Sequence, residues 1–339
     1  MQPRRLAVYA LSALSMLAGC GHKVSVGYLE SADVDLGDGV HQILVIDRVG
    51  ADNAAESFID ATEAVLTGEG IDGDRDTAEI ALQGLMAVLE QTGRYDVELM
   101  VDGQQVDRTL FGGTLDAREI QKLCRRHECD AIVSLDALDT DTAAQVEVTR
   151  DATGRSAEAT STTQLTATFR SYDADGSLLD SHYVRSAVED SSEDDTTRGA
   201  LSGLADPIQI QRDLAWEAGL MYGQRIAPHE VLAQRRLYAT GSPELKEASK
   251  RVEAGDWAGA VAIWKQIRAE GSPKDAAKAR YNLAIDKEIR GDLDSAIKFA
   301  TKAAVQLDSG RSRGYVADLT ARQADLERLA QQMSTADAG

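Results

Sequence analysis

Three aspartates, Asp72, Asp74 and Asp76, are the first residues whose spacing could support chemistry. They alternate like the first ligands of a calcium-binding loop. The glycine that such a loop needs at its sharp turn is absent, and no glutamate follows at the required distance. Carboxylates also stabilise the positive N-terminal end of a helix, so we interpret this group as a helix start.

A second group, Asp136, Asp139 and Asp141, follows an apolar run at 130–135 that reads as a buried strand. Ligands often bind at the ends of such strands in α/β proteins, so a hydrolase or ligand-binding site is one interpretation. A solvated loop is the other. An acid/base pair that forms only in space cannot be read from the sequence.

Cys124, His127 and Cys129 could be metal ligands, but their spacing matches no common zinc pattern and no fourth ligand lies nearby. In an oxidising compartment Cys124 and Cys129 could form a disulfide that closes a short, constrained loop. Two separate buried thiols are the alternative. The pattern therefore predicts no metal site.

Motifs for nucleophilic catalysis and phosphate binding are absent from the sequence. There is no Gly-x-Ser-x-Gly elbow, and the five histidines are not paired with an acid or a thiol motif. The stretch Phe111-Gly112-Gly113-Thr114 lacks the lysine and the spacing of a phosphate-binding loop. We therefore expect no enzymatic activity and no cofactor.

The N-terminal residues have the layout of a secretory signal peptide. Arg4 and Arg5 precede an apolar segment at 6–17, which is too short to span a bilayer. Small residues then lead to Cys20, and Leu17-Ala18-Gly19-Cys20 resembles a bacterial lipobox.

The lipobox resemblance implies that residues 1–19 are removed and that Cys20 becomes an acylated N-terminus, with chains such as palmitate. More than one acyl chain gives a stable membrane anchor. Gly21, rather than an aspartate, follows the cysteine, which favours the periplasmic face of the outer membrane. An uncleaved anchor or an ordinary secreted protein is the alternative.

The chain is strongly acidic, with a formal net charge of −20 at pH 7. Removal of residues 1–19 takes away two arginines and no acid, so the mature chain carries −22. Such a surface repels phosphates, which excludes nucleic acid as a partner and leaves membrane attachment to the N-terminal lipid. The mature length predicts about two domains.

Alternating strands and helices predict an α/β domain with a mixed sheet at 40–186. Apolar runs predict buried strands at 42–49, 95–101 and 130–135, with helices at 77–92 and 116–127 between them. Antiparallel strands are expected at 145–150, 162–172 and 178–186, the last after an Asp175-Gly176 turn. Residues 20–39 are expected to be a tether, and 187–205 an acidic loop.

The second half predicts an all-α domain at 206–335. Helices are expected at 206–226, 229–238 and 313–333, on either side of a pattern that occurs twice. The two copies, EASKRVEAGDWAGAVAIWKQI and NLAIDKEIRGDLDSAIKFATKAA, place Gly255-Asp256 and Gly291-Asp292 thirty-six residues apart. This period indicates stacked helix pairs and resembles the tetratricopeptide repeat (TPR).

The TPR resemblance implies a protein or peptide partner bound by the first helix of each repeat. The residues expected on that concave face are Leu245, Ser249, Glu253, Lys278, Tyr281, Ile285 and Glu288. Apolar and charged side chains together suit peptide or helix capture. The alternative is that Leu245, Tyr281 and Ile285 are covered by the last helix or by the α/β domain.

The order of parts resembles a family of bacterial lipoproteins with C-terminal TPR-like repeats and no assigned activity. The α/β half is also similar, more loosely, to periplasmic domains of the curli-secretion lipoprotein and of the translocation protein that precedes a β-propeller. These resemblances imply a lipid-anchored envelope scaffold that binds a protein. A self-assembling component of an export apparatus is the other non-enzymatic alternative, and the oligomeric state is left open.

Overall fold

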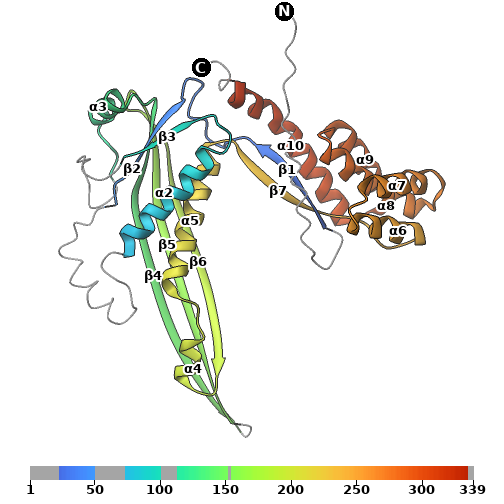
Figure 1. Ribbon diagram of the computed structural model, residues 1–339, viewed down its shortest axis with the longest axis horizontal. Helices are drawn as coiled ribbons and strands as arrows, with labels where there is room; N and C mark the ends of the chain where they lie inside the picture. Colours follow the sequence, from blue (N-terminus) through green and yellow to red (C-terminus); the bar gives the residue numbers. More distant parts are fainter. Residues whose placement is uncertain (1–22, 50–72, 101–112, 152–153, 335–339) are drawn as a thin grey trace, which may run out of the picture. The chain divides into compact units, whose positions relative to one another are not determined.

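The described part of the chain forms two compact units. The computed structural model describes residues 23–49, 73–100, 113–151 and 154–334 (Figure 1). The helical unit contains residues 23–31 and Glu230–Ala330, and the α/β unit contains Ala32–His229 and the described residues 331–334. The predicted fold class is confirmed, because an α/β region with a mixed sheet precedes a helical region.

A five-stranded sheet in the order β3-β2-β4-β5-β6 forms the centre of the α/β unit. Its strands are β2 (Gln42–Asp47), β3 (Asp96–Leu99), β4 (Ala131–Asp151), β5 (Gly154–Asp173) and β6 (Leu178–Asp194). β2 pairs in parallel with β3 and β4, whereas β4, β5 and β6 are antiparallel neighbours. The predicted turn at Gly176, with φ of 96°, joins β5 to β6.

Helices cover both faces of the parallel part of the sheet. α2 (Gly73–Leu89) and α5 (Pro207–Ile226) pack on one face, and α3 (Ala117–His127) packs on the other. Alternate side chains of β2 point to opposite faces of the sheet. Val45 packs in the core under α2 and α5, and Leu44 packs in the core under α3. This explains why β2 is an uninterrupted apolar run.

Glycines allow α2 and α5 to approach each other closely. A Cβ on Gly219 would lie 1.8 Å from the carbonyl oxygen of Ala81, and one on Gly84 would lie 2.4 Å from that of Trp216. The helix predicted to begin at Asp206 is present, capped by the Asp206 side chain. Its assignment to the all-α domain was wrong, because these small residues pack it against α2 in the α/β unit.

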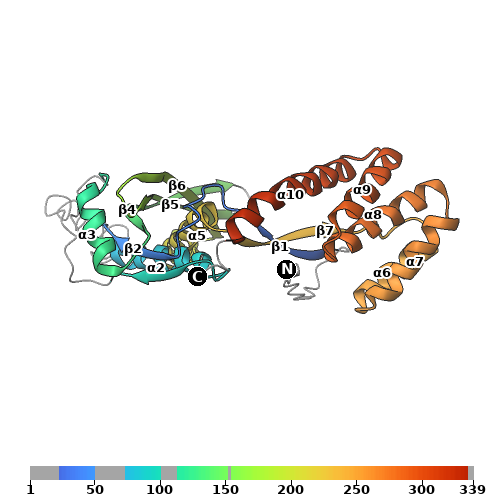
Figure 2. The ribbon, with the colours of Figure 1, turned by 90° about the horizontal axis from the view of Figure 1, so that it is seen from above.

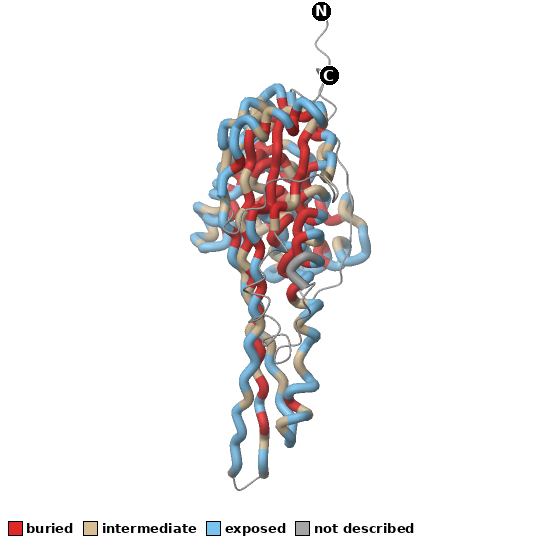
Figure 3. Tube along the Cα trace, turned by 90° about the vertical axis from the view of Figure 1, so that its left-hand side faces the viewer, coloured by how far each residue is buried: buried red, intermediate tan, exposed pale blue. Residues whose placement is uncertain are grey.

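Strands β4, β5 and β6 continue beyond the main core as a three-stranded arm (Figures 1 and 3). We define the arm as residues 142–151, 154–163 and 188–194 together with α4 (Thr197–Ser202). Toward its end, exposed and partly exposed residues predominate in Figure 3. A small cluster of Ala157, Ala159 and Ala200 joins α4 to the strands.

The acidic loop expected at 187–205 was wrong, as was the end of the α/β domain near residue 186. Residues up to Asp194 pair one to one with β5, which supplies partners for their backbone groups, and α4 follows. Acidic side chains do not prevent a strand here because Glu189, Glu193 and Asp194 are exposed to solvent and Asp190 is only half-buried.

The helical unit contains the predicted helix pairs and a long last helix. Its helices are α6 (Pro243–Glu253), α7 (Trp257–Glu270), α8 (Pro273–Ile289), α9 (Leu293–Leu307) and α10 (Gly310–Ser334). Gly255 and Gly291 have φ of 78° and 74° at the two expected turns. Asp256 and Asp292 cap α7 and α9 by accepting bonds from Gly259 N and Ser295 N.

A separate two-stranded sheet, β1 (Lys23–Glu30) with β7 (His229–Arg236), corrects two further expectations (Figure 2). The tether at 20–39 was wrong within its described part: Val26 of β1 belongs to the core of the helical unit, and Leu36 belongs to that of the α/β unit. The helix at 229–238 was wrong because alternate residues of β7 are shielded, which is the period of a strand.

Candidate functional site

Most residues predicted to form a partner-binding groove are buried inside the helical unit. At most 5% of the residue surface is exposed at Leu245, Ser249, Tyr281, Ile285 and Glu288. Lys278 is half-buried, and its Nζ donates to the carbonyl oxygen of Thr240 at 2.6 Å. Glu253 is exposed. The expectation of an open groove along these residues was therefore wrong.

The segment that follows β7 and helix α10 cover the expected concave face. Tyr238 packs edge-on against Tyr281, with 4.9 Å between ring centroids, and Tyr315 of α10 lies 5.0 Å from Tyr281. Asn282 Nδ2 donates to the carbonyl oxygen of Tyr238, and the Tyr238 N–H donates to Asn282 Oδ1, both at 2.8 Å. The alternative in which the last helix covers Tyr281 therefore describes the structure.

A buried ion network holds β1, β7 and α10 to the repeats. The carboxylate of Glu288 accepts bonds from Arg235 of β7 at 2.9 Å, Tyr315 at 2.8 Å and Arg322 at 3.3 Å. The guanidinium of Arg322 lies 3.9 Å from the ring centroid of Tyr28 in β1. Side chains of the protein itself therefore occupy the face on which a bound partner was expected.

The pKa values of Arg235 and Arg322, the two arginines of this network, are shifted in opposite directions. Burial by itself lowers the pKa of Arg235, but the hydrogen bonds and charge of Glu288 outweigh it and raise this pKa above its usual value. Burial lowers the pKa of Arg322, and the attraction of Glu288 offsets only part of that effect. Glu288 is thus the shared counter-ion of two shielded cations.

Asp136 lies at a bulge of β4, near the carboxyl end of the parallel strands. Its buried carboxylate accepts a bond from Arg48 Nη1 at 2.6 Å through Oδ1 and another from Arg170 Nη1 through Oδ2. Arg48 Nη1 also donates to the carbonyl oxygen of Gly113 at 2.7 Å. Since each oxygen already accepts from a guanidinium, Asp136 is the anion of a buried ion cluster that links β4 to β5 and to the segment after β2.

Asp139 and Asp141 do not join Asp136 in one site. Both are exposed, at alternate positions of β4 beyond the bulge, whereas Asp136 is 3% exposed. The described residues contain no group of three or more His, Cys, Asp or Glu that could hold a metal ion. Asp72 lies outside the described residues, and nothing is described of the side chain of Asp74. The geometry therefore gives the ligand-site interpretation no support.

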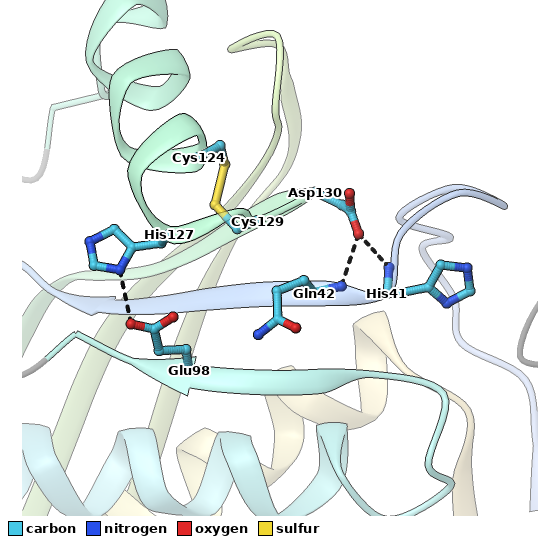
Figure 4. Close-up of a disulfide and its surroundings, with 7 residues drawn as sticks. All are labelled: His41, Gln42, Glu98, Cys124, His127, Cys129 and Asp130. Atoms are coloured by element: carbon cyan, nitrogen blue, oxygen red, sulfur yellow. Dashed lines mark hydrogen bonds and ion pairs between the residues drawn. A yellow bond between two sulfur atoms is a disulfide. The ribbon is translucent and has the colours of Figure 1, made fainter. Parts of the chain in front are cut away.

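Cys124 and Cys129 form a disulfide between the end of α3 and the start of β4 (Figure 4). Their Cα atoms lie 4.5 Å apart, which is a normal spacing for this bond. His127 Nδ1 lies 2.9 Å from Glu98 Oε1, away from the sulfur atoms. The cysteines therefore serve as a covalent link between a helix and a strand.

Two shallow depressions occur among the described residues. One of 280 Å³ lies between α9 and α10 and is lined by Thr301, Ala304, Val305, Asp308, Arg313 and Val316. The other, of 370 Å³, lies beside the disulfide and is lined by Gln121, Cys124, Arg125, Cys129, Ala174 and Asp175. In the second set, the two sulfur atoms are bonded to each other and supply no free thiol as a nucleophile. Cys20 lies outside the described residues, whose helices include none with the length and hydropathy to cross a bilayer.

Comparison with protein families adds a classification. The family model described as Domain of unknown function (DUF8603) matches residues 40–238, more than half of the chain. The chain belongs to this family. A second model, Domain of unknown function (DUF6340), matches residues 246–327 in the helical unit. No curated protein matches the chain.

The DUF8603 region contains the arm, which the sequence reasoning missed as a functional candidate. β6 is an edge strand: it pairs with β5 on one side and with none of the described strands on the other. Its register with β5 is one to one from Asp180 to Asp194, without a bulge. An edge of this kind presents a row of unpaired N–H and C=O groups.

The arm also has a polar outer face. Along β5, Ala157 and Ala159 are buried on the side of α4, whereas Glu158 and Thr160 alternate with them and are more exposed. Neighbours on β6 that share this outer face are the exposed residues Glu189, Ser191 and Glu193. The alternation of small and polar residues at 157–163 was the available signal.

Proposed function

We propose that this protein is a non-enzymatic, lipid-anchored scaffold of the cell envelope that binds a protein partner through its arm. The observation that carries the proposal is the long edge of β6, with which none of the described strands pairs, beside the exposed polar face of Glu189, Ser191 and Glu193. Proteins commonly cover or interrupt such edges because they are templates for pairing with another chain. An exposed edge of this length therefore supports a role in binding.

The filled concave face moves the proposed binding surface away from the TPR-like repeats. Glu288 and Tyr281 contribute there to the folding of the helical unit. The catalytic alternative lacks support because Asp136 is held between two arginines and its neighbouring acids are exposed. The lipobox at Cys20 and the disulfide support an oxidising envelope compartment.

Site-specific photo-crosslinking in the native envelope tests this proposal. A photoreactive amino acid replaces Ser191, which is exposed on the outer face of β6. The matched control replaces Ala321, which is exposed on α10 of the helical unit. We expect one reproducible protein adduct from position 191 and none of the same mass from 321. A protein adduct formed equally at both positions, or at neither, would contradict the proposal.

A further inference from the structure

We propose that the edge of β6 binds a basic, extended segment of the partner protein, which adds to the sheet as a further strand. The inference rests on the proposed function and names the chemistry of the partner. Strand addition obtains affinity from main-chain hydrogen bonds and specificity from alternate side chains. β6 offers both a main-chain edge for hydrogen bonds and a set of alternate side chains for specificity.

The main-chain contribution would come from the edge of β6, which lacks proline and lysine and has no bulge from Asp180 onward. Prolines, lysines, bulges and covering segments hinder edge pairing in general, whereas acidic side chains such as those of β6 disfavour an acidic strand and admit a basic one. The outer part of β4 also has an edge that pairs with none of the described strands, but it begins at the bulge between Leu135 and Ala137. β6 is therefore the better template.

The charge of the edge decides which partner fits. β6 carries five carboxylates, Asp180, Glu189, Asp190, Glu193 and Asp194, against one guanidinium, Arg185. Like charges placed opposite each other on adjacent strands are destabilising, so a second copy of this edge is a poor partner. Asp180 is already paired with Arg225 at 3.0 Å, so lysine or arginine on the added strand would instead face the exposed carboxylates of Glu189 and Glu193.

The side chains of β6 divide into two sets with different tasks. On the helix side, Asp194 accepts bonds from Thr196 N and Thr196 Oγ1, and Asp190 accepts one from Ala205 N at 2.7 Å. On the outer face, Glu189 and Glu193 are exposed, and Glu193 Oε1 also accepts a bond from Ser156 Oγ of β5 at 2.6 Å. A strand added to this edge has its outward side chains at every second position. Those that face Glu189 and Glu193 are four positions apart, and we predict lysine or arginine at these two.

Binding of synthetic peptides to the full mature chain tests the inference. The probe is a labelled peptide that alternates lysine with valine; one comparison peptide has glutamate for lysine, and another has alternate backbone nitrogens methylated. We expect the lysine peptide to bind and to slow amide hydrogen exchange in β6 selectively. The methylated peptide should bind much more weakly because it cannot donate the edge hydrogen bonds.

Matched charge variants separate the edge from general attraction to an acidic protein. Glu189→Lys with Glu193→Lys should weaken binding about tenfold. Glu217→Lys with Glu327→Lys makes the same change in net charge at exposed sites on α5 and α10, and should retain binding. Far-ultraviolet circular dichroism of both variants verifies that each is folded.

Several results would overturn the inference. These are failure of the lysine peptide to bind, equal binding of the methylated peptide, equal losses in the two variants, or protection of β4 instead of β6. Concentration-dependent dimerisation through β6 would point to a second copy instead. If position 191 still gives its adduct in the envelope after such a result, the scaffold proposal stands and only the partner chemistry is wrong.

Discussion

Glu288 is the single residue on which the ion network of the helical unit depends. It is 1% exposed and is the common acceptor for Arg235, Tyr315 and Arg322. The network links β7 and α10 to α8, so its role is to hold the chain's own elements on the repeats. Removal of one member of a buried ion cluster is costly because the remaining charges lose their compensation.

We predict that Glu288→Ala lowers the free energy of unfolding of the helical unit by about 3 kcal/mol. The control is Asp318→Ala, which removes another partner of Arg235. The Asp318 side chain is 57% exposed, so its removal should lower the free energy of unfolding by less than about 1 kcal/mol. Urea-dependent hydrogen exchange in peptides from Glu230–Ala330 provides the measurement. Similar losses in the two variants would show that the buried network is not a main source of stability.

At the scale of elements, the contact between α2 and α5 depends on the absence of side chains. The Cβ that Gly219→Ala introduces would overlap the carbonyl oxygen of Ala81 in the present backbone. We predict a loss of about 2 kcal/mol from the forced separation of the helices. The control, Gly314→Ala in α10, meets no atom within 4 Å and should gain up to about 1 kcal/mol from helix propensity. Urea unfolding of both variants decides this, and equal stabilities would refute the close contact.

The caps of α7 and α9 make the helical unit sensitive to acid. The pKa of Asp256 is lowered, mainly by the hydrogen bond from Gly259 N, and that of Asp292 is lowered, mainly by the Ser295 hydroxyl. A carboxylate with a folded-state pKa below its usual 3.8 contributes stability above that pH. This contribution is lost as the pH falls through the lowered value.

We therefore predict that the urea midpoint of the helical unit falls between about pH 5 and about pH 2. The double variant Asp256→Asn with Asp292→Asn should show a smaller fall. Near pH 7 it should come close to the unmodified chain, because asparagine caps helices as well as aspartate does. The ion pairs with Arg251 and Lys287 that it loses are largely exposed and contribute little. Parallel midpoints of the two proteins over the whole acid range would show that these caps do not cause the acid sensitivity.

Elements with a strong local pattern were predictable from the sequence, and those that depend on distant partners were not. β2 and the two Gly-Asp turns follow from hydrophobic runs and from turn chemistry. β1 alternates Val24, Val26 and Tyr28, but its partner β7 lies some two hundred residues away in the chain. In β7 the shielded position at Arg235 is charged, which conceals the strand period.

The candidate site could likewise not be predicted where it depends on contacts between distant parts of the chain. The TPR resemblance picked out Tyr281 and Glu288, but no local signal shows that the segment after β7 and helix α10 cover them. The edge of β6 was concealed because Glu189–Asp194 has the composition of a loop, and only pairing with β5 makes it a strand. Burial and pairing are properties of the tertiary structure, whereas composition is local.

At the scale of the whole molecule, the position of β1 limits how the chain can be anchored. β1 begins at Lys23, so only Gly21 and His22 separate Cys20 from a strand that belongs to the helical unit. At about 3.5 Å per extended residue, this link spans only about 10 Å. A lipid on Cys20 would therefore hold the helical unit at the membrane surface, without a flexible spacer between them.

We predict that Cys20→Ala releases the protein from the membrane fraction and abolishes labelling by palmitate. Its fold should be unchanged because β1 and its contact between Tyr28 and Arg322 are retained. The control, Cys124→Ser with Cys129→Ser, loses the disulfide but should keep the lipid label and the membrane location. Fractionation and metabolic labelling measure both properties. Persistence of Cys20→Ala in the membrane fraction would show that something other than an acylated Cys20 anchors the chain.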